Sequence, residues 1–291
     1  MRSVRGRALW LATGAIAILA AAQWLRTPSV PYVVASIVAT ALTLVAALRF
    51  DGRKKWAAVF IIAMGAFSIA SAIAQRSIAR VDNAWDAYRA DIEFGAADQL
   101  ERALLSTSAS LSQAARRALD APAEERAAFE KLGGLVDSWS GERGVVLYRA
   151  GRPVAWAGTT RVSTDDLTAP LGASFTPFYL TLYATATRGD ARAVATALVH
   201  ADPPTDRLAR PLDAAVARRS GVRGYEYERA SAAPGGYTMF ASRTDTLFGA
   251  RPAAITASEA RLRAVELATR RGAVLLGVAV SAWASPLRTL R

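Results

Sequence analysis

The sequence predicts an α+β protein in which N-terminal transmembrane helices precede a larger domain built from a long helix, a small antiparallel sheet and an exit helix. Three observations predict this fold class. Uncharged apolar runs follow one another within residues 1–75. A one-sided apolar stripe then indicates a long helix. From residue 144 onward, the apolar residues recur with the period of two that is typical of half-buried strands.

The uncharged runs cover residues 8–25, 30–48 and 56–74. Each approaches the ~20 residues that an α-helix needs to cross a hydrocarbon core about 30 Å thick. Buried helices of a soluble protein are the alternative, which three such runs in succession disfavour. We therefore expect residues 1–75 to form three transmembrane helices.

The first run admits a second alternative, which is a cleaved signal peptide. Basic residues precede it, and Ala20-Ala21-Ala22 resembles a signal-peptidase site. The run continues through Trp24 and the next span follows at once, so we expect it to be retained as a helix. The remaining topology is the same in either case.

Basic residues in the short loops predict the orientation, because they are enriched on the cytoplasmic side. They cluster before the first run and again between the second and third, at Arg49, Arg53, Lys54 and Lys55. The predicted topology is therefore a membrane crossed several times, with a cytoplasmic N-terminus and with residues 76–271 outside the cytoplasm.

A fourth apolar run covers residues 273–287 and leads to Arg288 and Arg291. It is short for a span and contains Pro286. We expect residues 272–291 to form a fourth, truncated transmembrane helix that ends where a cytoplasmic portion would begin.

Residues 76–271 read as one extracytoplasmic domain that opens with helices. Val81, Trp85, Tyr88 and Ile92 form a one-sided stripe, which fits either a cover for the sheet or a homodimer contact. The helix is expected to pause near Phe94-Gly95 and to stop before Pro122. A second helix would begin with Pro122, Glu124 and Glu125 in its first turn and end at Gly133-Gly134.

Strands follow from residue 144. The stretch GVVLYRAGRPVAWAG predicts a hairpin that turns at Ala150-Gly151, and a second hairpin is expected over residues 175–187 and 191–200. A short helix over 207–219, strands over 224–228 and 237–242, and an exit helix over 256–271 complete the domain.

Composition excludes several classes of site. The chain has no cysteine and a single histidine, His200, so thiolate zinc sites and sites that need two imidazoles are excluded. The net charge of +12 flanks the apolar runs, whereas residues 76–271 are nearly balanced, which argues against nucleic-acid binding. We expect no metal and no cofactor.

Catalytic signals are weak. No nucleophile-elbow or P-loop pattern is present. The adjacent carboxylates Asp165-Asp166 fit a loop or a helix cap better than an acid/base pair. Arg188-Gly189-Asp190 matches an adhesion tripeptide but fits a hairpin turn better. His200 ends a strand, and its position favours a strand-edge role over pH sensing.

The hairpin at residues 144–160, the long helix that precedes it and the exit helix that follows resemble the extracytoplasmic PAS-like (Cache-type) sensor region of bacterial sensor histidine kinases. The resemblance covers roughly residues 76–287 as architecture. It implies a location in the bacterial inner membrane, ligand sensing outside the cytoplasm and a phosphotransfer output inside. With His200 on the outer side, the chain offers no phosphoacceptor histidine, so the resemblance implies a sensory portion without its kinase core.

Aromatic residues on the predicted strands are the candidates for a ligand pocket, with core packing as the alternative for each. Tyrosine and tryptophan have polar tips that suit small mixed pockets. Arg149, Arg152 or Arg243 would suit a carboxylate ligand through bidentate contact. The candidate ligand-binding residues are Tyr148, Arg152, Trp156, Tyr179, Tyr183 and Tyr237.

The favoured function is the sensory and transmembrane portion of a signal-transduction receptor. A small-molecule or protein ligand would shift populations between two packings of the sheet and its flanking helices. A membrane-anchored envelope assembly or protein-interaction module is the alternative, and a periplasmic enzyme is a third. A pocket lined by Tyr and Trp would favour the sensor. A broad exposed apolar patch would favour the assembly module, and convergent ionisable groups in a cleft would favour the enzyme.

Overall fold

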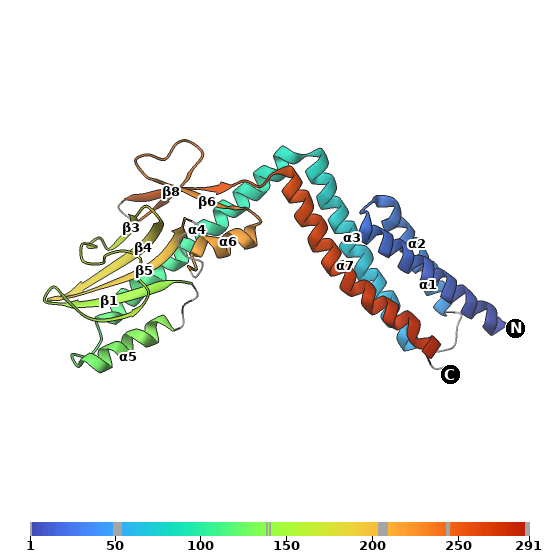
Figure 1. Ribbon diagram of the computed structural model, residues 1–291, viewed down its shortest axis with the longest axis horizontal. Coiled ribbons are helices and arrows are strands. Elements are labelled where there is room, and N and C mark those ends of the chain that lie inside the picture. Colours follow the sequence, from blue (N-terminus) through green and yellow to red (C-terminus); the bar gives the residue numbers. More distant parts are fainter. Residues whose placement is uncertain are drawn as a thin grey trace. The chain divides into compact units, whose positions relative to one another are not determined.

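The protein is described by a computed structural model that covers residues 2–48, 54–137, 139, 141–202, 209–242 and 245–288. The chain divides into two compact units (Figure 1). The apolar unit comprises Met1–Tyr88 and Thr256–Arg291, and the sheet unit comprises Arg89–Ile255. The predicted domain limits at residues 76 and 271 fall inside helices of the apolar unit.

The apolar unit contains α1 (Arg2–Arg26), α2 (Val30–Leu48), α3 (Lys54–Asn83) and α7 (Ala257–Arg288). Aromatic side chains join α1 to α3: Trp10 meets Phe60 edge-on at 5.4 Å, and Trp24 meets Phe67 at 5.8 Å between ring centroids. Gly14 lets α1 approach α7 closely, because a Cβ there would lie 2.6 Å from Trp283 Nε1.

Three stretches of these helices are long and apolar enough to cross a membrane: Ala8–Arg26, Val30–Leu48 and Lys55–Asn83. This confirms the prediction of three such helices near the N-terminus. Large apolar side chains are also exposed on the unit, among them Leu19, Ile62 and Val274. Such a surface is stable next to lipid and unfavourable in water.

The fourth apolar run is the second half of α7, which continues from Ala257 through Gly272 without a break. Among the described residues, α7 is not one of the helices that meet the length and hydropathy of a span. Arg49 and Arg53, which support the predicted orientation, lie outside the residues that the structure describes.

The helices of the sheet unit differ from prediction at their ends. Helix α4 (Trp85–Ala118) runs through Phe94-Gly95 without the expected pause, and only Ala84 separates it from α3. Helix α5 (Glu125–Val136) is capped by Glu124, whose carboxylate accepts hydrogen bonds from the backbone N–H groups of Arg126 and Ala127. It passes through Gly133-Gly134 because packing of its buried face, including Leu132, outweighs the low helix propensity of glycine.

The apolar stripe of the first helix is also divided. Val81, Trp85 and Tyr88 belong to the apolar unit, where the rings of Trp85 and Tyr88 lie 6.1 Å apart. Ile92 belongs to the sheet unit and packs against its core. The stripe is therefore not a single cover for the sheet.

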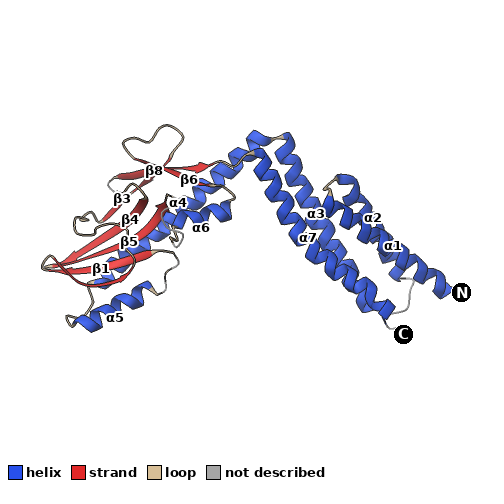
Figure 2. Cartoon of the chain, viewed as in Figure 1, coloured by secondary structure: helices blue, strands red, loops and turns tan. Residues whose placement is uncertain are grey.

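A five-stranded antiparallel sheet, in the order β2-β1-β5-β4-β3, forms the larger layer of the sheet unit (Figure 2). Its strands are β1 (Arg143–Arg149), β2 (Arg152–Gly158), β3 (Leu171–Phe175), β4 (Tyr179–Arg188) and β5 (Ala191–Ala201). The opening hairpin is confirmed, and its two-residue turn uses positive φ values at Ala150 (47°) and Gly151 (76°), which match the twist of the strands. The predicted second hairpin is β4 and β5. Strand β3 was not predicted, because it lies almost entirely before residue 175, in the segment that read as a connector between the two hairpins.

A three-stranded antiparallel sheet, in the order β6-β8-β7, forms the second layer. It consists of β6 (Gly224–Arg229), β7 (Thr238–Ala241) and β8 (Thr246–Ala253), and it follows α6 (Leu212–Ser220). Central strand β8 was missed because Gly249 and Pro252 weaken its strand pattern. The first residues of the helix predicted over 207–219 lie outside the described part of the chain.

One core joins both sheets to α4. Alternate residues of the five-stranded sheet, such as Leu147 and Leu182, face the buried side of α4, including Leu104 and Leu111. Phe240 and Phe248 of the second sheet enter the same cluster. One face of the five-stranded sheet is thereby covered by a helix, and the opposite face is left for other parts of the chain.

Candidate functional site

The face of the five-stranded sheet that points away from α4, here called the outer face, carries three of the six predicted ligand-binding residues. Alternation places Tyr148, Tyr179 and Tyr183 on it, together with Thr181 and Thr196. Many of its side chains are buried, and Val146, Tyr148 and Val194 pack together there with Leu167. Residues 159–170, the connector between β2 and β3, supply the cover.

Tyr148 lies under this connector. Its hydroxyl contacts Thr164 Oγ1 at 2.6 Å and donates to Asp165 Oδ1 at 2.9 Å. The guanidinium of Arg192 lies over its ring at 4.4 Å and donates to the carbonyl of Leu167. Burial raises the pKa of the Tyr148 phenol, and Asp165 adds to the rise. Tyr148 is thus a clamp for the connector, and its hydroxyl is already occupied.

The middle of the outer face is lined by hydroxyl groups. Tyr183 pairs with Gly172 on one side and with Thr196 on the other. Thr181 lies two residues before Tyr183 on β4 and on the same face of the sheet. It is 1% exposed, and its Oγ1 has no hydrogen-bond partner among the described residues. Burial raises the pKa of Tyr183, whose hydroxyl likewise forms no hydrogen bond within the described structure. The middle of the outer face thus holds two buried hydroxyls, those of Thr181 and Tyr183, for which the described residues provide no partner.

Arg161 closes the other end of the outer face. It forms an ion pair with Glu142, in which both side chains are mostly buried, and its guanidinium lies over the ring of Tyr179 at 5.3 Å. The connector is therefore anchored at both ends by charged and aromatic contacts. Thr185 adds hydrogen bonds to the carbonyls of Thr168 and Ala169.

The remaining predicted site residues lie elsewhere. Trp156 is on edge strand β2, is 56% exposed and meets Phe129 of α5 edge-on at 4.9 Å. Arg152 is exposed beside the hairpin turn. Tyr237 precedes β7 in the second sheet, where Arg251 lies over its ring at 5.0 Å. Arg149 binds the carbonyls of Ala121 and Pro122, and Arg243 is outside the described residues.

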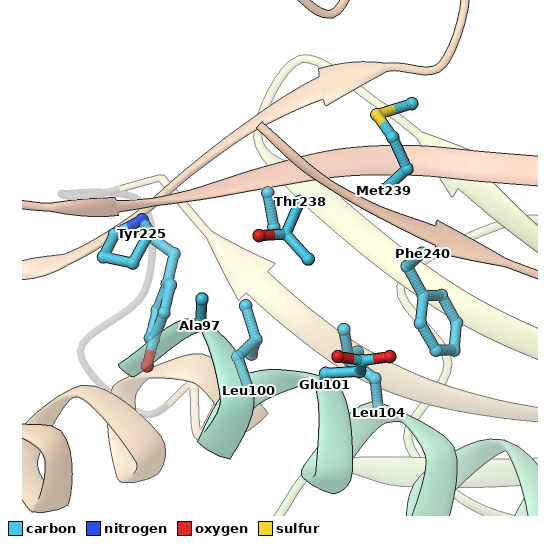
Figure 3. Close-up of a pocket in the computed structure, with 10 residues that line it drawn as sticks. Ala97, Leu100, Glu101, Leu104, Tyr225, Thr238, Met239 and Phe240 are labelled. Carbon is cyan, nitrogen blue, oxygen red and sulfur yellow. The ribbon is translucent and has the colours of Figure 1, made fainter. Parts of the chain in front are cut away.

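A narrow apolar cleft separates α4 from the three-stranded sheet (Figure 3). Leu100 and Leu104 project from α4 on one side, and Thr238 and Phe240 come from β7 on the other. Its free space suits about one water molecule. We call this hollow the α4 cleft. A bound molecule would have to displace α4 from the sheet in order to enter it.

The α4 cleft adjoins a wider open groove, with which it shares Ala97, Thr238 and Pro252. Ionisable groups converge here, as an enzyme would require, but they are paired. Arg89 binds Glu93 at 2.7 Å, and Arg251 Nε binds Glu226 at 3.2 Å. The bond to Glu226 raises the pKa of Arg251. The acids are thus engaged with arginines and are poorly suited to general acid or base work.

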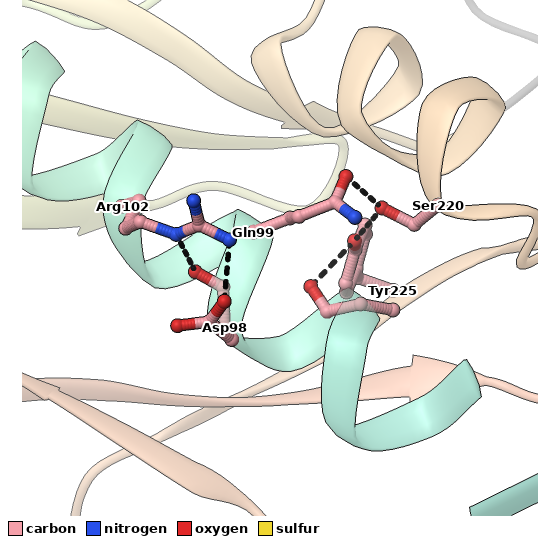
Figure 4. Close-up of polar contacts among 6 residues, drawn as sticks. Asp98, Gln99, Arg102, Ser220 and Tyr225 are labelled. Carbon is pink, nitrogen blue, oxygen red and sulfur yellow. Dashed lines mark hydrogen bonds and ion pairs between the residues drawn. The ribbon is translucent and has the colours of Figure 1, made fainter. Parts of the chain in front are cut away.

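Polar contacts join α4 to α6 and β6 at the edge of the α4 cleft (Figure 4). Tyr225 donates to the carbonyl of Ala96 at 3.0 Å, and Ser220 donates to Gln99 Oε1 at 2.9 Å. Burial is the main cause that raises the pKa of Tyr225. These contacts hold the middle of α4 in a fixed register against the second sheet.

Sequence reasoning missed the α4 cleft because it missed β8, whose Ala250 and Pro252 form part of the wall. The available signal was the pair Phe248 and Ala250, which alternate with Gly249 and Arg251 in the manner of a strand. Within the residues that the structure describes, no group of three or more His, Asp or Glu side chains could hold a metal ion.

The fold and its helices define an α+β protein with three candidate membrane spans and a separate two-sheet unit. No protein-family model, curated protein or solved structure matches the chain.

Proposed function

We propose that this chain is the sensory and transmembrane portion of a bacterial signal-transduction receptor, with a PAS-like sheet unit that detects a signal outside the cytoplasm. The sensor histidine kinase type of output follows from the family resemblance. The long helix on one face of an antiparallel sheet, opened by the 144–158 hairpin, supports that resemblance.

One observation carries the proposal: both walls of the α4 cleft lead along the chain to a pair of packed helices. Helix α4 follows α3 after the single residue Ala84, and β8 ends at Ala253, shortly before α7 begins at Ala257. In the apolar unit, α3 and α7 pack together, with Gly272 against Phe67 and an ion pair of 3.5 Å between Arg261 and Asp82. A change in the spacing of the cleft walls would therefore reach the α3–α7 pair.

The outer face supplies the ligand chemistry in this proposal. A small molecule with hydrogen-bonding groups would engage Thr181 and Tyr183 beneath the connector, and the sheet would transmit the change to α4 on its opposite face. The mechanism is a population shift, because the ligand favours one of two packings of α4. Pairing of two chains into a homodimer belongs to the same proposal, with the half-buried rings of Trp85 and Tyr88 as its contact, because Val81 is buried within the apolar unit.

Spin labels on the α3–α7 pair test this coupling, and the cysteine-free chain allows clean labelling. Cysteines at the exposed positions Ala79 and Leu262 would carry the labels in the full chain in nanodiscs. The variant Ala97→Leu inserts a larger side chain into the α4 cleft. We expect it to shift the mean interlabel distance by about 1–2 Å, as in helix shifts that switch receptors.

The matched control is Ser106→Leu, which adds the same side chain at an exposed position of α4. It should leave the distance unchanged. A small-molecule screen by thermal shift on the same full chain should also find compounds that reproduce the Ala97→Leu distance. An unchanged distance in Ala97→Leu, in a variant that melts cooperatively, would contradict the proposal.

A protein-interaction module in the cell envelope is the second candidate, and Phe94 favours it. This side chain is 79% exposed and lines the wide groove. Large apolar side chains exposed in a groove often mark a docking surface. If the groove binds a protein, Phe94→Ser would abolish that binding and leave the interlabel distance unaffected.

A further inference from the structure

The single histidine of the chain lies where three elements meet. His200 is near the end of β5, Asp213 is in the first turn of α6, and Tyr227 is in β6. His200 Nδ1 lies 2.6 Å from Asp213 Oδ2, and the imidazole centroid is 5.1 Å from that of Tyr227. The cluster thus joins the five-stranded sheet, α6 and the three-stranded sheet.

Asp213 is 4% exposed, whereas the His200 side chain is 31% exposed. A buried carboxylate is costly unless a charge or a hydrogen bond compensates it. Water can exchange a proton with the partly open imidazole, but the carboxylate is shielded. Asp213 also lies in the first turn of α6, whose N-terminus favours a negative charge, so protonation of His200 adds to an existing compensation of the carboxylate.

The other groups that face the imidazole do not replace this compensation. From β6, the buried Tyr227 hydroxyl lies close to Asp213 but makes no hydrogen bond of normal geometry with a described residue. Burial, followed by the charge of Asp213, raises the pKa of Tyr227 well above its ordinary value. On the same face of β6, Tyr225 donates to the carbonyl of Ala96, and the guanidinium of Arg229 lies over the ring of Phe175 at 5.1 Å. Strand β4 presents the apolar Leu180 opposite His200, and the charged residue Asp202 follows β5 in the chain.

Protonation changes the strength of the contact. A neutral imidazole can donate one hydrogen bond from Nδ1 to the carboxylate. An imidazolium donates the same bond and adds a positive charge, and such charge-assisted bonds are roughly twice as strong as neutral ones. Histidine is the side chain that ordinarily changes charge between about pH 5 and 8.

We propose that the His200–Asp213 contact is a pH-dependent latch that holds α6 and β6 against the five-stranded sheet in acid and loosens as the pH rises. The sign follows from the charges: the ion pair exists only while His200 is protonated, so its contribution is present at low pH and is lost on deprotonation. The proposal goes beyond ligand sensing, because it gives the sheet unit a response to protons. It rests on contacts within the sheet unit alone.

Hydrogen–deuterium exchange on the full chain in nanodiscs tests the latch. The chain should be purified without a histidine tag, and exchange should be measured at pH 5.5 and pH 8 after correction for the intrinsic rate. We expect amide protection in α6 and β6 to fall by about fivefold from the lower to the higher pH, which corresponds to losing roughly 1 kcal/mol of a charge-assisted bond. Peptides from β1 and β2 should change little.

The variant His200→Asn is the control, because its amide can donate near the position of Nδ1 but does not titrate. Its α6 and β6 peptides should differ by less than about twofold between the two pH values, since only a neutral bond remains. Asp213→Asn should lose the pH dependence as well. The latch is excluded if the wild-type chain shows no fall in protection, or if folded His200→Asn shows the same fall.

Discussion

Tyr148 and Trp156 lie on the two strands of one hairpin, yet their side chains have opposite environments. Tyr148 is 2% exposed because the connector packs on it, and its hydroxyl is satisfied by Thr164 and Asp165. Trp156 is on the edge strand, where it meets Phe129 of α5 edge-on and remains 56% exposed. Strand periodicity placed both residues on strands, but the strand order decided which of them is covered.

The hydroxyl of Tyr148 should be a measurable source of stability. Tyr148→Phe removes two hydrogen bonds and leaves Thr164 and Asp165 without that partner, so we expect a loss of about 1–2 kcal/mol in the free energy of unfolding. Tyr183→Phe is the matched control, because the Tyr183 hydroxyl has no partner in the described structure. It should change stability by less than about 0.5 kcal/mol. Equal losses in the two variants, by chemical denaturation, would contradict the clamp role of Tyr148.

At the scale of elements, the close approach of β3 and β4 depends on Gly172. The Tyr183 side chain lies over this glycine, and a Cβ at position 172 would come within 2.8 Å of Tyr183 Cε1. The ring therefore occupies the space that any larger residue would need. This contact fixes the position of the Tyr183 hydroxyl in the middle of the outer face.

Gly172→Ala should destabilise the protein by about 1–3 kcal/mol, because overpacking forces the tyrosine out of its place. Adding Tyr183→Ala should remove most of the extra cost of Gly172→Ala, so that the two effects are not additive in a double-mutant cycle. Gly134→Ala in α5, where no atom lies within 4 Å of the added Cβ, should instead stabilise by about 0.5–1 kcal/mol. Strict additivity of the 172 and 183 changes would refute the proposed contact.

For the whole molecule, the central prediction is topology. If the sheet unit lies outside the cytoplasm, alkaline phosphatase fused after residue 200 should be active. A fusion after Arg53, in the loop predicted to be cytoplasmic, should be inactive, because basic loops are retained inside. Enzyme activity normalised to fusion protein gives the readout. Activity at Arg53 with inactivity at residue 200 would invert the proposed orientation.

Local patterns predicted a large part of this fold. The three long apolar helices, the 144–158 hairpin and the β4–β5 hairpin all follow from hydropathy and from glycine at turns. Helix ends were predicted less well. Glu124 is the N-cap of α5, whereas we expected it within the first turn, and α7 continues through Gly272, whereas we expected the exit helix to end at residue 271. Packing of a buried helix face compensates the low helix propensity of a single glycine. This packing energy comes from tertiary contacts, so local sequence patterns do not reveal it.

The sequence by itself determined the alternation of apolar and polar segments, the absence of cysteine and the single histidine, because these depend only on composition and period. Only the tertiary structure decided which aromatic residues are covered, where the α4 cleft lies and that His200 meets Asp213. Those features depend on strand order and on contacts between residues distant in the chain. The 144–158 hairpin is encoded locally, but the buried state of Tyr148 comes from a connector that returns across the sheet.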